Sequence, residues 1–294
     1  MKIGFVGLGQ MGKHMAINML KSGADLIVND IKTDCFQELA GKGASTTSHL
    51  GAIAQAEIIF LSLPGSEVVK NVLLGETGLG QQLTAGQIVV DLSTIKYTTT
   101  IELAQRLAER GVVFIDAPVS GMEARAVDGT LTVMCGGAAE TIATIRPYLE
   151  CIGNKILHMG DTGSGQLTKL INQLLFDINV AALAEILPMS VKMGLDPDKV
   201  GQVVNSGTGR SYASEFFIPR ILKDSFTEGY HLEHAYKDLV SAAEIGASQC
   251  IPLPVLNAAT STYQMALLKG YGKQDKGAMI RVFEELLGVS YRSR

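Results

Sequence analysis

The sequence Lys2-Ile3-Gly4-Phe5-Val6-Gly7-Leu8-Gly9-Gln10-Met11-Gly12 joins an apolar run to a G-x-G-x-x-G turn, and an amphipathic pattern follows. This order predicts a strand, a glycine turn and a helix. Gly7 permits the tight turn, Gly9 lets the backbone approach a pyrophosphate, and Gly12 lets helix and strand pack closely. Phosphates would bind at the start of the helix, where unpaired N–H groups and the helix dipole favour an anion. The stretch therefore predicts a dinucleotide-binding site.

A second apolar run supports this prediction, because it ends in an acidic residue about 20 residues after the turn. Leu26-Ile27-Val28 is followed by Asn29-Asp30. A carboxylate there accepts hydrogen bonds from ribose hydroxyls and repels a 2′-phosphate. Ile31 offers no cation, whereas Lys32 remains within reach of a phosphate. We therefore expect NAD, with NADP less favoured; the alternative is a turn of another α/β protein with Asp30 solvated. The expected nucleotide contacts here are Gly7, Leu8, Gly9, Gln10, Met11, Gly12, Asn29, Asp30 and Ile31.

Composition indicates an ordinary globular protein. The 294 residues are 47% hydrophobic and 18% charged, which suits a soluble chain with room for two domains. A net charge of −4 without a basic stripe argues against nucleic acid as a partner. The four cysteines form no C-x-x-C pair and are expected to be reduced thiols, as in the cytoplasm. Glycines interrupt the first apolar stretch, and no later stretch looks long and uncharged enough to cross a bilayer, so we expect a cytoplasmic protein without a membrane partner.

Apolar runs alternate with helical patterns up to about residue 160. Further strands are expected at 58–63, 88–92, 112–116, 131–134 and 155–158, with helices near 33–41, 67–73 and 97–109. This alternation predicts a parallel sheet covered by helices on both faces. The expected fold is a Rossmann-type α/β domain, residues 1–162, and an all-α domain, residues 163–294, joined by a long interdomain helix. That helix is expected at 166–192, with Pro188 kinking or splitting it, and others near 198–205, 212–223, 231–247, 253–268 and 275–287.

The start of the long helix carries the polar groups best suited to catalysis. Lys169, Asn172 and Gln173 are spaced i, i+3 and i+4, so they share one helical face. A lysine near a helix N-terminus is unfavourable, and burial beside a cofactor cleft would lower its pKa toward the range useful in acid/base catalysis. The alternative is a lysine whose amine reaches solvent. Lys237 is a second candidate, with a surface ion pair as its alternative. The five histidines show no metal-ligand or triad spacing, so no metal site is expected.

These motifs together resemble the β-hydroxyacid dehydrogenase family, and the resemblance covers essentially the whole chain. Its landmarks occur in order: the Gly7–Gly12 turn with Met11 and Asn18, Asp91–Thr94, Asp116–Gly121, Gly129–Thr132, Gly163–Lys169 and Lys237–Leu239. The resemblance implies NAD-dependent interconversion of a short 3-hydroxy acid and its semialdehyde, of the 3-hydroxyisobutyrate, tartronate semialdehyde or 2-(hydroxymethyl)glutarate type. It also implies a homodimer or homotetramer.

The same resemblance assigns roles to individual residues. Lys169 would be the general acid/base, with Asn172 or Gln173 orienting the substrate. The substrate carboxylate would bind the hydroxyl and backbone N–H groups of Ser120, Gly121 and Met122. The cofactor would further contact Leu63, Pro64, Val68, Thr94 and, near the nicotinamide, Lys237.

Departures from the family pattern concern specificity. Many members have a second glycine where this chain has Met122, and an asparagine where it has Gln173. A Gly-Arg-Ser-Tyr stretch containing Arg210 is similar to one in the 2-(hydroxymethyl)glutarate dehydrogenase branch, and Arg210 would bind a second carboxylate there. Arg125 is an alternative, and either arginine would otherwise form a structural ion pair. The rival functions are an NADPH-dependent reductase of small aldehydes, such as glyoxylate or succinic semialdehyde, and a non-catalytic NAD-binding sensor or scaffold.

Overall fold

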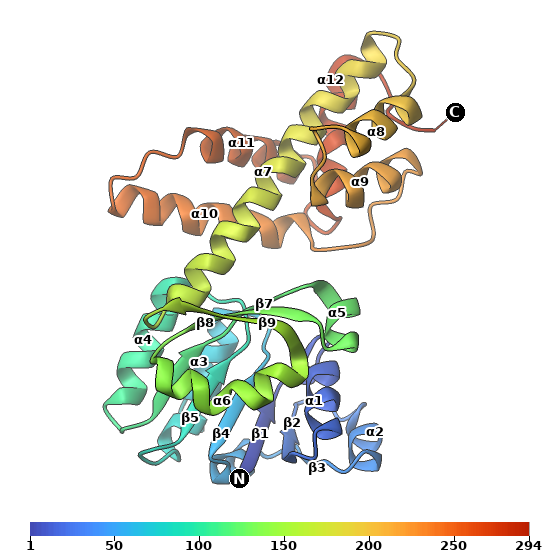
Figure 1. Ribbon diagram of the computed structural model, residues 1–294. Helices are drawn as coiled ribbons and strands as arrows, with labels where there is room; N and C mark the ends of the chain where they lie inside the picture. Colours follow the sequence, from blue (N-terminus) through green and yellow to red (C-terminus); the bar gives the residue numbers. More distant parts are fainter. Residues whose placement is uncertain (294) are drawn as a thin grey trace. The chain divides into compact units, whose positions relative to one another are not determined.

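The computed structural model describes residues 1–293 and divides into two compact units, Met1–Lys169 and a second that begins at Leu170. The first unit is built on a nine-stranded sheet of order β3-β2-β1-β4-β5-β6-β8-β7, with β9 paired to β8 (Figure 1). Its strands are β1 (Lys2–Val6), β2 (Asp25–Asn29), β3 (Ser45–Thr47), β4 (Ile58–Leu61), β5 (Ile88–Asp91), β6 (Val113–Asp116), β7 (Val119–Ser120), β8 (Leu131–Gly136) and β9 (Gly153–Gly160). Its helices are α1 (Gly12–Lys21), α2 (Phe36–Gly41), α3 (Ser66–Leu74), α4 (Tyr97–Ala108), α5 (Met122–Asp128) and α6 (Ala139–Ile152), with 3₁₀ turns η1 (Leu50–Gln55) and η2 (Leu79–Gln81).

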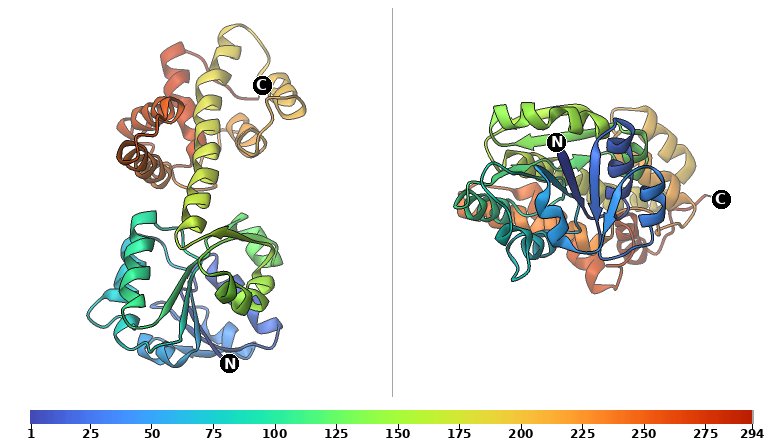
Figure 2. Two further views of the ribbon diagram at one scale, coloured as in Figure 1. Left: turned by 60° about the vertical axis from the view of Figure 1, so that its left-hand side comes forward. Right: turned by 90° about the horizontal axis from the view of Figure 1, so that it is seen from below.

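The strands from β3 to β6 form a parallel sheet covered on both faces, as the sequence predicts. Their order, 3-2-1-4-5-6, is that of the Rossmann fold. Successive side chains point to opposite faces. Phe5 and Phe60 pack in a core with α1 and α6, whereas Val6 and Leu61 pack in a second core with α3 and α4. Figure 2 shows helices on both sides of this sheet.

The sheet is not parallel throughout. β8 is antiparallel to β6, where Asp116 pairs with Gly136, and antiparallel to β7. β7 and β8 are linked through α5, which has only seven residues. A crossover between parallel strands needs a dozen residues or more, so the chain reverses instead. The expected parallel arrangement therefore holds for the first six strands, and β9 returns to being parallel with β8.

In the second unit the described residues form helices and loops only. Besides the greater part of α7 (Ser164–Lys192), they form α8 (Pro197–Ser206), α9 (Tyr212–Leu222), α10 (Leu232–Ser248), α11 (Pro254–Leu268), η3 (Lys276–Met279) and α12 (Ile280–Leu287). The core contains Val180 and Leu187 from α7, Phe217 from α9, Leu239 from α10 and Tyr263 from α11. Each of these side chains is at most 2% exposed, so this unit has an apolar core of its own.

Helix α7 bears on two expectations drawn from the sequence. It runs unbroken through Pro188, which excludes the split there and leaves the kink as an expectation. Its 29 residues are also long and apolar enough to span a membrane by length and composition, contrary to the expectation that no stretch is. A single such helix is weak evidence for a span, because core helices of soluble proteins pass the same test. Val180, Ala181, Ala184 and Leu187 of α7 are buried in the core of the second unit.

Candidate active site

The glycine turn between β1 and α1 is tightly packed at two of its three glycines and open at the third. Gly7 has a φ of 95°, and a Cβ there would clash with the carbonyl oxygen of Ser62. A Cβ on Gly12 would clash with the carbonyl oxygen of Gly7, so this position is closed by the turn itself. Gly9 differs, because a Cβ there would meet no protein atom within 4 Å. Packing within the protein thus explains why positions 7 and 12 are glycine. The open space at Gly9 fits a ligand that approaches the backbone.

Asp30, at the end of β2, is tied to the turn. Its Oδ2 accepts a hydrogen bond from the backbone N–H of Leu8 at 2.6 Å, and its Oδ1 accepts one from the N–H of Lys32 at 2.8 Å. Ile31 beside it is 94% exposed. Asp30 borders a hollow of about 390 Å³, whose lining also includes Leu8, Gly9, Gln10, Lys32, Asp34 and Glu123. The second lysine of the lining, Lys13, is paired with Glu38 at 2.5 Å.

The loops after β4 and β5 lie side by side at the same edge of the sheet. The backbone N–H of Leu63 donates to Oγ of Ser93 at 2.9 Å. Pro64 and Thr94 are exposed on these loops, and Val68 is exposed in the first turn of α3, so all three are accessible to a ligand. The parallel pairing of β4 with β5 brings these predicted cofactor contacts together.

Two buried carboxylates lie beneath these loops. Oδ1 of Asp91, the last residue of β5, accepts a hydrogen bond from the N–H of Ser93 at 3.0 Å. Burial raises the pKa of Asp91 to about 7; hydrogen bonds from Ser93 oppose the shift and the charge of Asp116 adds to it. Asp116, the last residue of β6, accepts hydrogen bonds from the N–H groups of Gly163 at 2.7 Å and Gln166 at 2.9 Å. Burial raises its pKa as well, and those two N–H groups work against the shift.

Asp116 fixes the start of α7 and with it the place of Lys169. Its carboxylate meets the N-terminal N–H groups of α7, where a negative charge is favourable. Gln166, 2% exposed, donates from its amide to the carbonyl of Ser93 at 2.7 Å. Lys169 follows one turn later and is 9% exposed. The lysine therefore lies in the same unit as the nucleotide turn, on a helix attached to the carboxyl ends of β5 and β6.

The loop after β6 contains the predicted carboxylate-binding residues. Ser120 lies in β7 and is half-buried. Gly121 has a φ of 145°, and a Cβ there would clash with the side chain of Arg125. Met122 has a φ of 61°, a conformation that favours glycine, and its side chain is 46% exposed. The next residue, Glu123, accepts a hydrogen bond from the amide of Gln10 at 2.7 Å, which links this loop to the nucleotide turn.

The remaining predicted site residues belong to the second unit. The amide of Asn172 donates to Oε1 of Gln173 at 3.3 Å, so the two predicted orienting residues are hydrogen-bonded to each other. Lys237 is exposed on α10. Arg210 is exposed, with its guanidinium 3.6 Å from a carboxylate oxygen of Glu215.

Two charged clusters in this unit were not expected from the sequence. The histidine spacing predicts no metal site, yet ligand atoms of His231, Glu233 and His234 lie within 4.8 Å of one another. The second cluster is fully buried: the ammonium of Lys276 binds the carboxylate of Asp177 and lies 3.8 Å from the ring centre of Phe176. Burial lowers the pKa of Lys276, and the charge of Asp177 opposes that shift.

Known proteins share this arrangement. Residues 2–160 match the NAD binding domain of 6-phosphogluconate dehydrogenase, and residues 163–283 match the NAD-binding domain of NADP-dependent 3-hydroxyisobutyrate dehydrogenase. The chain is 38% identical over 291 residues to 2-(hydroxymethyl)glutarate dehydrogenase of Eubacterium barkeri, a match that covers 98% of this chain and 97% of the relative. The chain belongs to the β-hydroxyacid dehydrogenase family.

Solved structures place the chain in the same family of dehydrogenases. A 3-hydroxyisobutyrate dehydrogenase from Salmonella typhimurium matches with a TM-score of 0.85 and 27% identity over 96% of this chain and 99% of that one. A protein named Psf3, in complex with NADP+ and 2-OPP, matches with a TM-score of 0.80 and 28% identity over 97% and 99%. This β-hydroxyacid dehydrogenase is thus an oxidoreductase with an NAD(P)-binding domain, and the open approach to Gly9 suits such a cofactor.

Two functional candidates in this dehydrogenase, Asp116 and Gln166, do not stand out in the sequence beyond the landmarks that contain them. With Ser93, which follows a predicted strand, they join the cofactor loops to the helix of Lys169. Their signal was weak: each is a polar residue directly after, or at the end of, an apolar run or turn. Only the pairing of β5 with β6 brings Ser93 and Asp116 to the same helix.

Proposed function

We propose that the chain oxidises a short 3-hydroxy acid reversibly to its semialdehyde with NAD, and that Lys169 is the general acid/base. The observation that carries this proposal is the buried place of Lys169 on a helix capped by Asp116 in the nucleotide-binding unit. A scaffold that only binds a nucleotide has no need of a buried lysine there. Membership of the β-hydroxyacid dehydrogenase family supports the same reaction class.

In the proposed oxidation, Nζ of neutral Lys169 accepts the proton of the substrate hydroxyl. The bound cofactor supplies the acceptor for the hydride that leaves the carbinol carbon. The hydroxyl of Ser120 and the N–H groups of the loop that follows hold the carboxylate, and Asn172 or Gln173 orients the hydroxyl. Reduction of the semialdehyde returns the proton from the lysine ammonium to the carbonyl oxygen. The protein therefore contributes position and proton transfer.

A preference for NAD rests on Asp30. Its carboxylate lies beside an exposed Ile31 and takes hydrogen bonds from two backbone N–H groups, which keeps a negative charge where a 2′-phosphate would bind. Lys13, the other cation of the hollow besides Lys32, already pairs with Glu38. These contacts favour ribose hydroxyls over a phosphate.

For the substrate we propose a 3-hydroxy acid with a second carboxylate, of the 2-(hydroxymethyl)glutarate type. Support comes from the 38% identity to a dehydrogenase of that name and from Arg210. The guanidinium of Arg210 is exposed, and Glu215, with which it forms an ion pair, lies 3.6 Å away, too far for a strong bidentate pair. An incoming carboxylate would therefore compete with a weak interaction.

Steady-state kinetics with a panel of acids tests these proposals. The panel is 3-hydroxyisobutyrate, D-glycerate, 2-(hydroxymethyl)glutarate, L-threonate and 2,3-dihydroxypropanesulfonate, each with NAD and with NADP. Lys169→Ala should retain NADH affinity while kcat falls by several orders of magnitude, and wild-type-like turnover in that variant removes Lys169 from the mechanism. Arg210→Ala should lose the preference for the dicarboxylate alone. If a monocarboxylate or the sulfonate is preferred and Arg210→Ala matches wild type, the second-carboxylate proposal is wrong.

The two rival functions give different outcomes in the same assay. NADH binding without turnover of any acid or aldehyde would indicate a sensor or scaffold. Higher efficiency with NADPH on glyoxylate or succinic semialdehyde than with NAD on any hydroxy acid would indicate a small-aldehyde reductase.

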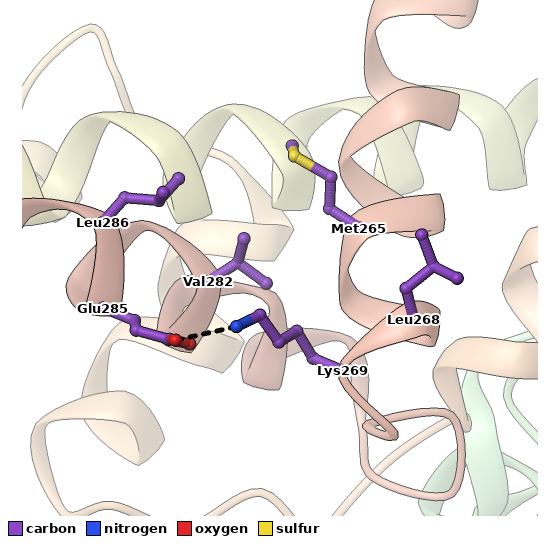
Figure 3. A pocket seen from close by; sticks show the side chains of 6 residues that line it. All are labelled: Met265, Leu268, Lys269, Val282, Glu285 and Leu286. Atoms are coloured by element: carbon purple, nitrogen blue, oxygen red, sulfur yellow. Dashed lines mark hydrogen bonds and ion pairs between the residues drawn. The ribbon is translucent and has the colours of Figure 1, made fainter.

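We also propose a homo-oligomer formed through the second unit. Leu268 of α11 and Leu286 of α12 are 89% and 70% exposed beside an apolar hollow of about 250 Å³ that also contains Met265 and Val282 (Figure 3). Exposed apolar groups of this kind mark interaction surfaces. Light scattering should show a dimer or tetramer for wild type and a smaller species for Leu268→Lys/Leu286→Lys. A monomeric wild type would refute the proposal.

A further inference from the structure

One side chain, Gln166, connects the first turn of α7 to the loop after β5 at two points. Its amide nitrogen donates to the carbonyl oxygen of Ser93 at 2.7 Å, and its amide oxygen accepts from the N–H of Ile95 at 3.2 Å. The side chain is 2% exposed, so water does not replace these contacts. An apolar side chain of the same shape would leave a buried C=O and a buried N–H unsatisfied, which is costly.

This connection extends to the cofactor loop. The carbonyl oxygen of Ser93 accepts the hydrogen bond from the Gln166 amide. The hydroxyl oxygen of Ser93 accepts a second one, from the backbone N–H of Leu63 at 2.9 Å. The backbone N–H of Gln166 itself donates to Asp116 at 2.9 Å. One residue of α7 is thus bonded to the loop after β5 and to the end of β6, and through Ser93 to the loop after β4.

Lys169 follows Gln166 by three residues, so both lie on the same face of α7, about 4.5 Å apart along its axis. A rigid turn of helix carries any shift of Gln166 to the lysine. Proton transfer depends on the position of the amine, because a misplacement of about 1 Å can cost about 100-fold in rate.

We propose that Gln166 is a positioning residue that holds Lys169 at a fixed place relative to the loops that contact the cofactor. This inference rests on the proposed function, because it assumes that Lys169 transfers the proton. Nothing in it requires Gln166 to touch substrate or cofactor.

Gln166→Met is the direct test, since methionine keeps the length of the side chain and removes both hydrogen bonds. With the acid of the five-member panel that wild type oxidises best, kcat should fall about 10–100-fold, while the affinity for NADH and the KM change by less than about threefold. The matched control is Gln87→Met. The Gln87 side chain, at the opposite end of β5, likewise bonds mainly to backbone. It accepts from the N–H of Thr84 at 2.6 Å and donates to the carbonyls of Ala54 and Ala56 at 2.8 and 2.6 Å, and it also accepts from the Thr84 hydroxyl at 3.2 Å. Its loss should lower the melting temperature and leave kcat unchanged.

Gln166→Glu provides a second test that does not depend on how far Gln166→Met is destabilised. The protonated carboxyl has the shape of the amide, and its O–H donates to Ser93, whereas the carboxylate cannot donate. Relative to wild type, kcat of this variant should be restored at low pH and fall as pH rises, in a range shifted upward because burial raises a carboxyl pKa.

Three outcomes overturn the proposal. The first is a Gln166→Met enzyme with wild-type kcat while Lys169→Ala is inactive, which would make Gln166 an anchor of the helix only. The second is an equal loss of kcat in Gln87→Met, which would assign the effect to general destabilisation. The third is a kcat ratio of Gln166→Glu to wild type that does not change with pH. Full turnover in Lys169→Ala would instead refute the proposed function, on which the inference rests.

Discussion

The carboxylate of Asp30 accepts a hydrogen bond from the backbone N–H of Leu8 at 2.6 Å, although 22 residues separate them in the sequence. Leu8 lies inside the glycine turn, between Gly7 and Gly9. Asp30 therefore holds the turn, and under the proposed function we expect it also to present a negative charge to the ribose of the cofactor. Substitutions at Asp30 can separate these two roles.

Asp30→Ala should raise the efficiency ratio of NADPH to NADH by about tenfold or more, since about 1.4 kcal/mol of discrimination corresponds to that factor. Asp30→Asn should raise the ratio similarly but retain more stability, because its amide oxygen still accepts the N–H of Leu8. Kinetics with both cofactors and urea denaturation measure the two effects. Asp34→Ala, which alters another carboxylate of the same hollow, is the control. A wild-type ratio already near one would show that Asp30 does not select the cofactor.

Met122→Gly should be more stable than Met122→Ala. Met122 has a φ of 61°, which costs a residue with a Cβ roughly 1–2 kcal/mol and costs glycine little. Both variants remove the same side chain, so their difference in unfolding free energy isolates the backbone effect. Denaturant titration of the pair gives the difference directly, and a less stable glycine variant would contradict it. If the Met122 side chain also contacts the substrate, both variants should change the order of kcat/KM values within the acid panel equally.

Asp91 should make the protein less stable as pH rises from about 4 to about 7. Burial raises its pKa from 3.8 to about 7, so the folded state holds the proton more tightly than the unfolded state does. The resulting stabilisation is complete below the unfolded pKa and is lost as pH rises through the folded pKa, up to about 4 kcal/mol at about 1.4 kcal/mol per pKa unit. In Asp91→Asn this part of the pH dependence should vanish. Identical slopes of unfolding free energy against pH in wild type and variant would refute it.

Lys276→Met should destabilise the second unit by about 3–5 kcal/mol, because it leaves the buried carboxylate of Asp177 without the ammonium. The double variant Lys276→Met/Asp177→Leu should recover much of this loss, since it removes both buried charges. The exposed pair Lys269–Glu285, 2.7 Å apart, is the control, and Lys269→Met should cost far less stability because solvent screens the exposed pair. Thermal and urea unfolding of the three variants would measure this. Equal losses in the buried and exposed pairs would contradict the expected difference.

Much of the first unit could be predicted because its signals are local. The apolar runs at Lys2–Val6 and Leu26–Val28 and the glycines between them follow directly from strand burial and turn sterics. Ligands of parallel sheets bind outside the carboxyl ends of the strands, so Leu63, Ser93 and Thr94, which follow two predicted strands, are expected at one edge. The parallel pairing of β4 and β5 brings them together there. The roles of Lys169, Ser120 and Arg210 remain predictions that the kinetic experiments above would test.

What could not be predicted depends on contacts distant in sequence. The reversal of β8 depends on α5 being too short for a crossover, and a seven-residue helix has no clear period. The continuity of α7 through Pro188 shows that tertiary packing outweighs the local cost of proline. Asp116 and Gln166 are 50 residues apart, and Asp177 and Lys276 are 99 apart, so no spacing rule links them. Glu233 lies between His231 and His234 in the sequence, and only the folded backbone shows that ligand atoms of all three lie within 4.8 Å of one another.

The boundary between the two units falls within a helix, after Lys169 and before Asn172. Consider a chimaera of two relatives joined at the loop before α7. Its sheet, with Asp116, would come from one parent, whereas the N–H groups that bind Asp116, Gln166 and Lys169 would come from the other. A junction placed after Lys169 would keep these groups with their own sheet. It would exchange only the rest of α7, with Asn172 and Gln173, and the helices that follow. If the proposed roles are correct, the lysine that transfers the proton and the amides that orient the substrate belong to separate pieces of one helix, and recombination within α7 is expected to exchange the amides while the lysine stays with its own sheet.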